Sequence, residues 1–221
     1  SCDVGTEERT LIRDQIYVID PNSIMYEISQ HPQDAFNPVE AKPQIIPLSQ
    51  RANVNWLEKD YLQIAVALFK VAWGEPLDEW RLNSMNFRLS CNDVERGFQQ
   101  ASFSFFKMVQ IREKPSRFER SMSINLGNDS VSILEYEYYP KVADWSSVEW
   151  SRLKIPADEA LLIAEKNGGK EKRLVVGNNC DIVVMLSPGS ASFKGWLASY
   201  IQGGTTNLFR LDIDPLTGNY K

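Results

Sequence analysis

The chain has 221 residues, of which 43% are hydrophobic and 24% charged, the balance of a folded globular protein. Its net charge is −5 and lysine and arginine are not concentrated in any stretch, which argues against nucleic-acid binding through a basic surface. No run of about 18 apolar residues occurs, so the sequence predicts no membrane-spanning helix.

Residues 1–53 contain five prolines and only short apolar runs. Because proline lacks a backbone donor and disfavours helix before it, we expect an irregular, extended N-terminal arm with one strand at 15–19. The only histidine, His31, lies in this arm, where a catalytic base would be poorly fixed.

Cys2 follows a small residue close to the start of the sequence. This arrangement resembles the lipid-acceptor cysteine of bacterial lipoproteins, which predicts lipid attachment at Cys2 and a location outside the cytoplasm. The alternative is that the sequence simply starts at an arbitrary point and Ser1 is foreign to it.

Cys91 and Cys180 each lie in a predicted strand. No Cys-x-x-Cys string or Cys–His spacing indicates zinc or redox chemistry. We expect two buried free thiols, and a Cys91–Cys180 disulfide is the alternative.

Residues 56–73 are apolar around nearly the whole helical circumference and are followed by Gly74, a typical helix end. The segment therefore predicts a buried helix with Ala65 and Leu68 in the core. Four strand-like segments follow, at 82–91, 98–111, 121–126 and 130–139.

The apolar phase of the last of these segments changes between Ile133 and Leu134, which predicts a bulge or a change of the covered face. In the same segment Glu135 and Glu137 share one strand face, with Cα atoms about 7 Å apart. That spacing overlaps the range for paired carboxylates in glycoside hydrolysis. An enzyme of this kind, a small hydrolase or sugar-active protein using acidic residues, is the alternative function.

A second helix is predicted at 155–169, where Pro156 and acidic residues come early and two glycines come last. Strands are expected after it at 180–186, 193–200 and 208–213. An offset of 99 aligns the two predicted helices at identical residues, which are Leu62, Ile64 and Ala65 with Leu161, Ile163 and Ala164.

Helix followed by antiparallel strands thus occurs twice. The sequence predicts an α+β protein of two sequential units, each a helix packed on its own antiparallel sheet. The expected divisions are the arm at 1–53, a first unit at 54–144 and a second unit at 145–221.

The sequence DIDPLTG at 212–218 contains the acidic side chains that a calcium loop would use. An EF-hand needs glycine at its sixth position, however, and Thr217 stands there. Proline, Gly218 and the short polar side chains instead favour a tight turn that closes a last hairpin.

The second half, from Ile155 to Lys221, resembles a PepSY or PepSY-like domain. The resemblance rests on IPADEALLIAEKNGG, on FKGWLASY, and on LFRLDIDPLTGNYK with its Asp-x-x-Thr-Gly turn. It implies an extracytoplasmic, non-catalytic module that binds or restrains peptidases or mediates cell-envelope contacts. The first half would be a divergent repeat of the same unit.

Trp145 and Trp150 lie in the connector between the two predicted units, where they either fill a seam or contact a partner. The sequence therefore favours a non-catalytic binding or scaffolding protein, secreted or lipid-anchored to a bacterial cell envelope. We expect a protein or peptide partner, no cofactor and no metal; the oligomeric state stays open.

Overall fold

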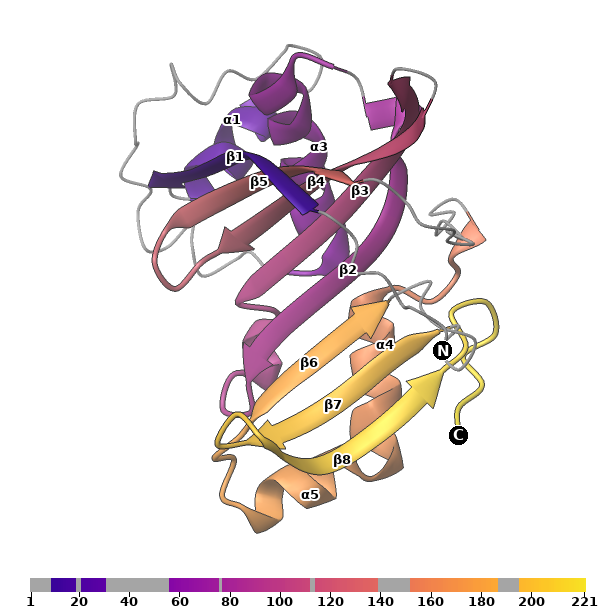
Figure 1. Ribbon diagram of the computed structural model, residues 1–221. Coiled ribbons are helices and arrows are strands. Elements are labelled where there is room, and N and C mark those ends of the chain that lie inside the picture. Colours follow the sequence, from indigo (N-terminus) through magenta and orange to yellow (C-terminus); the bar gives the residue numbers. More distant parts are fainter. Residues whose placement is uncertain are drawn as a thin grey trace, which may run out of the picture.

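The computed structural model describes residues 9–18, 21–30, 56–75, 77–111, 114–138, 152–186 and 195–221. Its centre is one eight-stranded sheet in the order β1-β5-β4-β3-β2-β6-β7-β8, in which every neighbouring pair is antiparallel (Figure 1). The strands are β1 (Arg9–Val18), β2 (Arg81–Ser90), β3 (Gln100–Ile111), β4 (Lys114–Asn125), β5 (Ser130–Tyr138), β6 (Asp181–Leu186), β7 (Trp196–Gln202) and β8 (Thr206–Ile213).

The helices lie mainly before β2 and before β6. They are α1 (Pro21–Gln30), α3 (Glu58–Trp73), α4 (Ala157–Ala164), a π-helical turn (Glu165–Gly169) and α5 (Lys170–Val175), with short 3₁₀ turns at Leu77–Glu79 and Val94–Arg96. As predicted, α3 ends at Gly74, which adopts a positive φ of 68°. Ala65 and Leu68 are buried, also as predicted.

The prediction of two separate helix-on-sheet units is wrong. Strands β2 and β6, one from each expected unit, pair directly from Met85 opposite Leu186 to Ser90 opposite Asp181. This pairing satisfies the backbone groups that two separate sheets would each leave open at an edge. The chain therefore has one continuous sheet.

The expected irregular arm is also wrong for the part that the structure describes, although the strand predicted at 15–19 overlaps β1. Residues 9–18 form β1, which pairs with β5 along its whole length. Residues 21–30 form α1, in which Ile24 is buried in the core and Pro21 occupies the first helical position. Pro21, the one of these five prolines that the structure describes, is thus compatible with the start of a helix.

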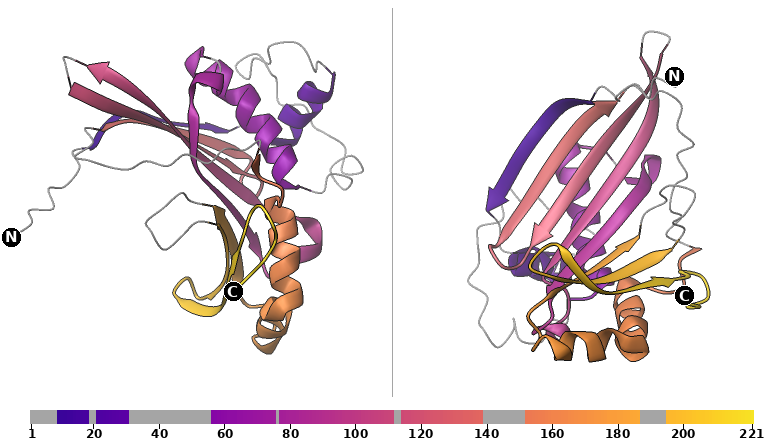
Figure 2. Two further views of the ribbon diagram at one scale, coloured as in Figure 1. Left: turned by 90° about the vertical axis from the view of Figure 1, so that its right-hand side faces the viewer. Right: turned by 60° about the horizontal axis from the view of Figure 1, so that its bottom comes forward.

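Helices α3 and α4 cover the same face of the sheet. On this face Phe87 of β2 packs against Tyr61 of α3, with ring centroids 6.2 Å apart, and lies opposite Val184 of β6. Val184 is in turn opposite Ala198, two residues from Tyr200, whose hydroxyl donates to the π-helical turn after α4. Figure 2 shows the helices on one side of the sheet, with the other side free of described helices.

The offset of 99 seen in the sequence reappears in space. The first residues of the two helices, Glu58 and Ala157, are separated by 99 positions and joined by a hydrogen bond. The same offset separates Asn86 from Met185, which lie directly opposite each other in the β2–β6 pair. The two halves of the sheet are thus related by an approximate twofold axis that passes through the β2–β6 pair.

The second helix continues beyond its predicted end. The chain kinks at Asn167 and Gly168 and then resumes as α5. Gly168 has a φ of 116°, and a Cβ on Gly169 would collide with the hydroxyl of Tyr200. The two glycines therefore permit a kink that brings the chain against β7 instead of ending the helix.

Among the described residues, no helix is long and apolar enough to cross a membrane, in agreement with the sequence prediction.

Candidate functional site

Four of the residues singled out in the sequence lie outside the described residues. They are Cys2, His31, Trp145 and Trp150. Lipid attachment at Cys2 and partner contact through the two tryptophans therefore stay predictions.

The C-terminal acidic segment forms the predicted hairpin. The Asp214 carboxylate accepts hydrogen bonds from the backbone N–H groups of Leu216, at 2.7 Å, and Thr217, at 3.2 Å. Gly218 has a φ of 75°, and Ile213 pairs with Tyr220 across the turn. One carboxylate oxygen of Asp214, Oδ1, is thus used by the backbone of the turn.

Glu135, one of the two candidate catalytic acids, takes part in a buried ion pair. Its Oε1 accepts from Arg120 Nε at 3.1 Å, and its Oε2 accepts from the indole of Trp73 at 3.1 Å. The Arg120 guanidinium stacks on three aromatic rings and lies 4.1 Å from the centroid of Trp80. The Glu135 carboxylate is therefore paired with the Arg120 guanidinium near the end of α3.

Glu75, immediately after α3, completes this cluster. It accepts from Arg120 Nη2 at 3.1 Å and from the indole of Trp80 at 3.2 Å. Burial on its own would raise the pKa of Glu75, but the hydrogen bonds from Arg120 and Trp80 and the nearby positive charges hold its pKa below the usual range. Both carboxylates of the cluster thus act as counter-ions of Arg120.

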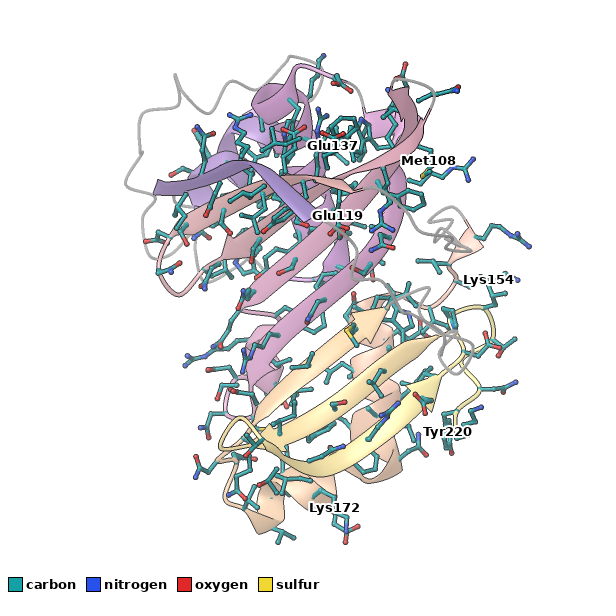
Figure 3. All side chains as sticks on the ribbon, in the orientation of Figure 1. Met108, Glu119, Glu137, Lys154, Lys172 and Tyr220 are labelled. Carbon is teal, nitrogen blue, oxygen red and sulfur yellow. A yellow bond between two sulfur atoms is a disulfide. The ribbon has the colours of Figure 1, made fainter. Side chains whose placement is uncertain are left out.

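Glu137 and Ile133 share the helix-covered face of β5 with Glu135, because the β4–β5 register is regular throughout. The phase change that the sequence showed is therefore a change of covered face, not a bulge in this strand pair. Leu134 and Tyr136 are half-buried on the opposite, helix-free face. Figure 3 labels Glu137 on β5 and Glu119 on β4, which lie on opposite faces.

A second buried ion pair lies in the other half of the sheet. The Arg173 guanidinium donates through Nε and Nη2 to Glu165 at 2.8–3.1 Å, and through Nη1 to Asn178. The hydroxyl of Tyr200 donates to the same carboxylate at 2.8 Å. Hydrogen bonding to Glu165 raises the pKa of Arg173, while burial raises the pKa of Tyr200 above its usual range.

Glu58 lies where the first turns of α3 and α4 meet. It is only 7% exposed, and its Oε2 accepts from the backbone N–H of Ala157 at 2.5 Å. Burial raises the pKa of Glu58 to about 7, the hydrogen bond from Ala157 opposes this rise, and the charge of Asp158 adds to it. An acid with such a pKa is a candidate catalytic group, but here it caps a helix.

The two cysteines form a disulfide, contrary to the expected free thiols. Cys91 follows β2 and Cys180 precedes β6, with Cα atoms 5.3 Å apart. The backbone N–H of Cys91 also donates to the carbonyl of Cys180 at 2.9 Å. The disulfide therefore covalently joins the two halves of the sheet where their central strands pair.

The helix-free face carries a row of serines across three strands. Ser102 of β3 is opposite Ser123 of β4, which is opposite Ser132 of β5. The hydroxyl oxygens of Ser102 and Ser123 are 3.0 Å apart, and the amide of Gln100 donates to Ser123 at 3.1 Å. All four residues are half-buried, so the row combines hydrogen-bonding groups with partial exposure.

Next to this row the face becomes charged and more buried. Arg117 pairs with Glu119 at 2.6 Å and lies over the ring of Phe106. The hydroxyl of Ser104 is buried and has no hydrogen-bond partner in the part of the chain that the structure describes. Unsatisfied buried hydroxyls are uncommon in folded proteins. This face, lined by serines and a buried ion pair, is the candidate binding surface.

Within the described ranges, no group of three or more metal-ligating side chains is close enough to hold a metal ion.

The sequence contains a signal for the Arg120–Glu135 ion pair. Arg120 has the same strand phase as the buried Met122, and Glu135 has the same phase as the buried Ile133. Arg120 immediately precedes the strand predicted at 121–126, and a charged residue in the buried phase of each of two neighbouring strands indicates a buried pair. Arg173 and Glu165 lie on either side of a kink that the sequence did not predict, so no simple periodicity relates them.

No family model and no curated protein matches this chain. A solved structure of the full-length peroxisomal multifunctional enzyme type 2 from Drosophila melanogaster is 9% identical, with a TM-score of 0.23 over 97% of this chain and 46% of that one. A MaoC-like dehydratase from Phytophthora capsici is also 9% identical, with a TM-score of 0.19 over 97% of this chain and 92% of that one. The chain thus spans about half the length of the first structure. Similarity this weak establishes neither a shared fold nor a shared activity.

Proposed function

We propose that the chain is a non-catalytic binding protein of an extracytoplasmic compartment, and that it binds a protein or peptide partner on the helix-free face of its sheet. The observation that carries the compartment is the Cys91–Cys180 disulfide. Disulfides persist in oxidising environments and are rare in reducing ones. Lipid attachment at Cys2 would hold such a protein at a cell envelope.

The acidic residues support a binding role more than the alternative of a hydrolase. Glu135 is a counter-ion of Arg120, Glu165 of Arg173, and Glu58 caps a helix. A pair of carboxylates in glycoside hydrolysis must reach the substrate from both sides of the scissile bond. These three carboxylates are held by contacts within the fold, which favours a structural role for them over contact with a substrate.

The serine row supports binding through the opposite face. Half-buried hydroxyls offer adaptable hydrogen bonds, and neighbouring Leu134 and Tyr136 add apolar surface. A partner strand or loop on this face could also satisfy the buried hydroxyl of Ser104. The PepSY-like resemblance of residues 155–221 suggests a peptidase as this partner.

Two experiments test the proposal. Alkylation of the protein purified from its native compartment should label Cys91 and Cys180 only after reduction, as read by intact mass. Labelling of both cysteines without reduction would contradict the proposed compartment.

Chemical cross-linking in intact cells, followed by mass spectrometry, tests the surface. Ser102→Arg should abolish the cross-linked partner because it places a long charged side chain on the serine row. Gln63→Arg, an exposed position on α3, should leave the cross-link unchanged. Equal cross-linking by both variants, with thermal unfolding unchanged, would show that the binding surface lies elsewhere.

A further inference from the structure

The lipid attachment proposed at Cys2 would fix a bilayer close to one end of the sheet. Residues 3–8 alone separate Cys2 from Arg9, the first residue of β1. An extended chain advances at most about 3.6 Å per residue, so the steps from Cys2 to Arg9 cover no more than about 25 Å. The part of the fold that lies nearest the lipid therefore follows from where β1 begins.

Strand β1 begins at the end of the sheet where the β3–β4 hairpin projects. The row of paired residues that starts at Arg9 crosses β5 and β4 and ends at Met108 of β3. Of the described strands, only β3 and β4 continue beyond this row, as far as Ile111 opposite Lys114 (Figure 2). Because neighbouring strands lie about 4.8 Å apart, Met108 lies about 14 Å from Arg9. The short chain from Cys2 therefore brings the whole row close to the bilayer.

Three exposed apolar side chains lie at this end. Leu11 and Ile12 of β1 are 51% and 49% exposed, and Met108 is 48% exposed. Leu11 and Met108 lie on the helix-free face, because Leu11 is opposite Tyr136 and Met108 has the strand phase of Ser102. Ile12 is the extra residue where the β1–β5 register shifts. Transfer of such half-exposed apolar surface out of water is favourable.

We infer that this end of the sheet lies on a phospholipid bilayer, with Leu11, Ile12 and Met108 in contact with lipid. The inference rests on the lipid attachment at Cys2 that is part of the proposed function. A single acyl chain holds a protein to a membrane only marginally, and a second contact makes the attachment stable. The three apolar side chains supply that second contact, because they lie beside the point at which the short chain from Cys2 joins the fold.

The length of the chain from Cys2 selects a bilayer over other occupants of this end. A lipid on Cys2 brings the bilayer within about 25 Å of Arg9, whatever else the protein binds. The other end of the sheet has no such constraint, since β8 is the last strand counted from β1 and α5 packs beside β8. Figure 3 labels Met108 and Lys172 of α5 at opposite ends of the molecule. Val175 of α5 is 79% exposed and therefore serves as a comparison.

Photo-cross-linking in vesicles tests the contact. Cys2 is the only cysteine outside the disulfide, so the full chain can be coupled through it to phosphatidylcholine vesicles that carry a maleimide phospholipid. Benzoylphenylalanine in place of Leu11 or of Met108 should form covalent lipid adducts on illumination, read by mass spectrometry. The same residue in place of Val175 should not. Adducts of equal yield at all three positions, or none at Leu11 and Met108, would overturn the inference.

Substitution separates the apolar contact from the length of the chain. Ile12→Asp with Met108→Asp should lower the yield of lipid adduct at Leu11 about tenfold, because two apolar side chains that gain from leaving water are replaced by charges that do not. Val175→Asp should leave this yield unchanged. Circular dichroism and thermal unfolding verify that each variant is folded. An unchanged yield in the double variant would refute docking through these side chains.

The lipid attachment and the docking surface can fail separately. Detergent-phase partitioning and intact mass of the native protein, compared with Cys2→Ser, test the attachment in the cell. A native Cys2 without lipid would overturn the proposed attachment and this inference together. A lipidated Cys2 with no adduct at Leu11 or Met108 would overturn the docking surface alone.

Discussion

Besides Arg117 on the helix-free face, each half of the sheet buries one arginine near the end of its helix, and the two halves stabilise that charge by different means. In the first half Arg120 lies among aromatic faces, 4.1 Å from the ring centroid of Trp80, with carboxylates from Glu75 and Glu135. Its Nη1 is buried and finds no hydrogen-bond partner among the described residues. The aromatic ring faces thus stabilise part of the Arg120 charge that hydrogen-bond acceptors would otherwise stabilise.

In the second half Arg173 depends on one carboxylate. Glu165 accepts hydrogen bonds from both Nε and Nη2 of Arg173, and only Asn178 adds a further acceptor. The first cluster distributes its negative charge over two residues, whereas the second concentrates it on one. A buried charge with one counter-ion is the more vulnerable, because removing that counter-ion leaves it uncompensated.

The largest expected effect concerns the link between the halves. Replacing both cysteines, Cys91→Ala with Cys180→Ala, opens a loop whose ends are 89 positions apart. Chain entropy predicts a loss of about 4.6 kcal/mol in the free energy of unfolding, measured by urea denaturation.

The same variant tests whether the halves are one cooperative body. With the β2–β6 pairing intact, a single transition should remain when unfolding is followed by both fluorescence and far-UV circular dichroism. Two separate transitions would show that the halves fold independently and that only the disulfide couples them.

The contrast between the arginines gives the next prediction. Glu165→Ala should lower the free energy of unfolding by about 3–5 kcal/mol, because Arg173 loses its counter-ion. Glu135→Ala should cost about 1–3 kcal/mol, since Arg120 keeps Glu75 and its aromatic faces. Urea denaturation of both variants measures the difference, and equal costs would refute the contrast.

Glu58 joins the two halves at their helix starts and should make stability depend on pH. Its folded pKa of about 7 exceeds the ordinary value of 4.5, so the folded state holds a proton that the unfolded state releases. The contribution is fully present below about pH 4.5 and is lost as pH rises through about 7, amounting to about 3 kcal/mol.

Glu58→Gln should remove this dependence while its amide oxygen still accepts from Ala157. The variant should match the parent near pH 4.5 and exceed it near pH 8 in urea denaturation. The exposed Glu79→Gln serves as the control and should leave the pH profile unchanged. A parent profile that is flat between these pH values would place the Glu58 pKa near its ordinary value.

The smallest expected effect concerns the C-terminal turn. Asp214→Ala removes the one side-chain oxygen that accepts two backbone hydrogen bonds, and should cost about 1 kcal/mol. Calcium should not change the melting temperature of the parent, measured by differential scanning calorimetry, because the Asp214 carboxylate is used by the turn. A saturable rise with calcium, absent from Asp214→Ala, would instead show a bound cation.

The sequence by itself determined the local elements. Apolar residues around the whole helical circumference predicted that Leu68 is buried, and Pro215 with Gly218 predicted the last turn. Alternation placed Met122 and Ile124 inward on β4. Each of these features depends on neighbours in the chain, where side-chain periodicity and backbone preference act directly.

Tertiary structure alone decided how the elements join. The β2–β6 pairing is made by backbone hydrogen bonds, which any non-proline residue supplies, so no residue pattern announces it. The Cys91–Cys180 disulfide and the addition of β1 to β5 depend in turn on which strands become neighbours. The buried arginines follow the same rule, because a charge enters the core only where distant residues supply its counter-ions.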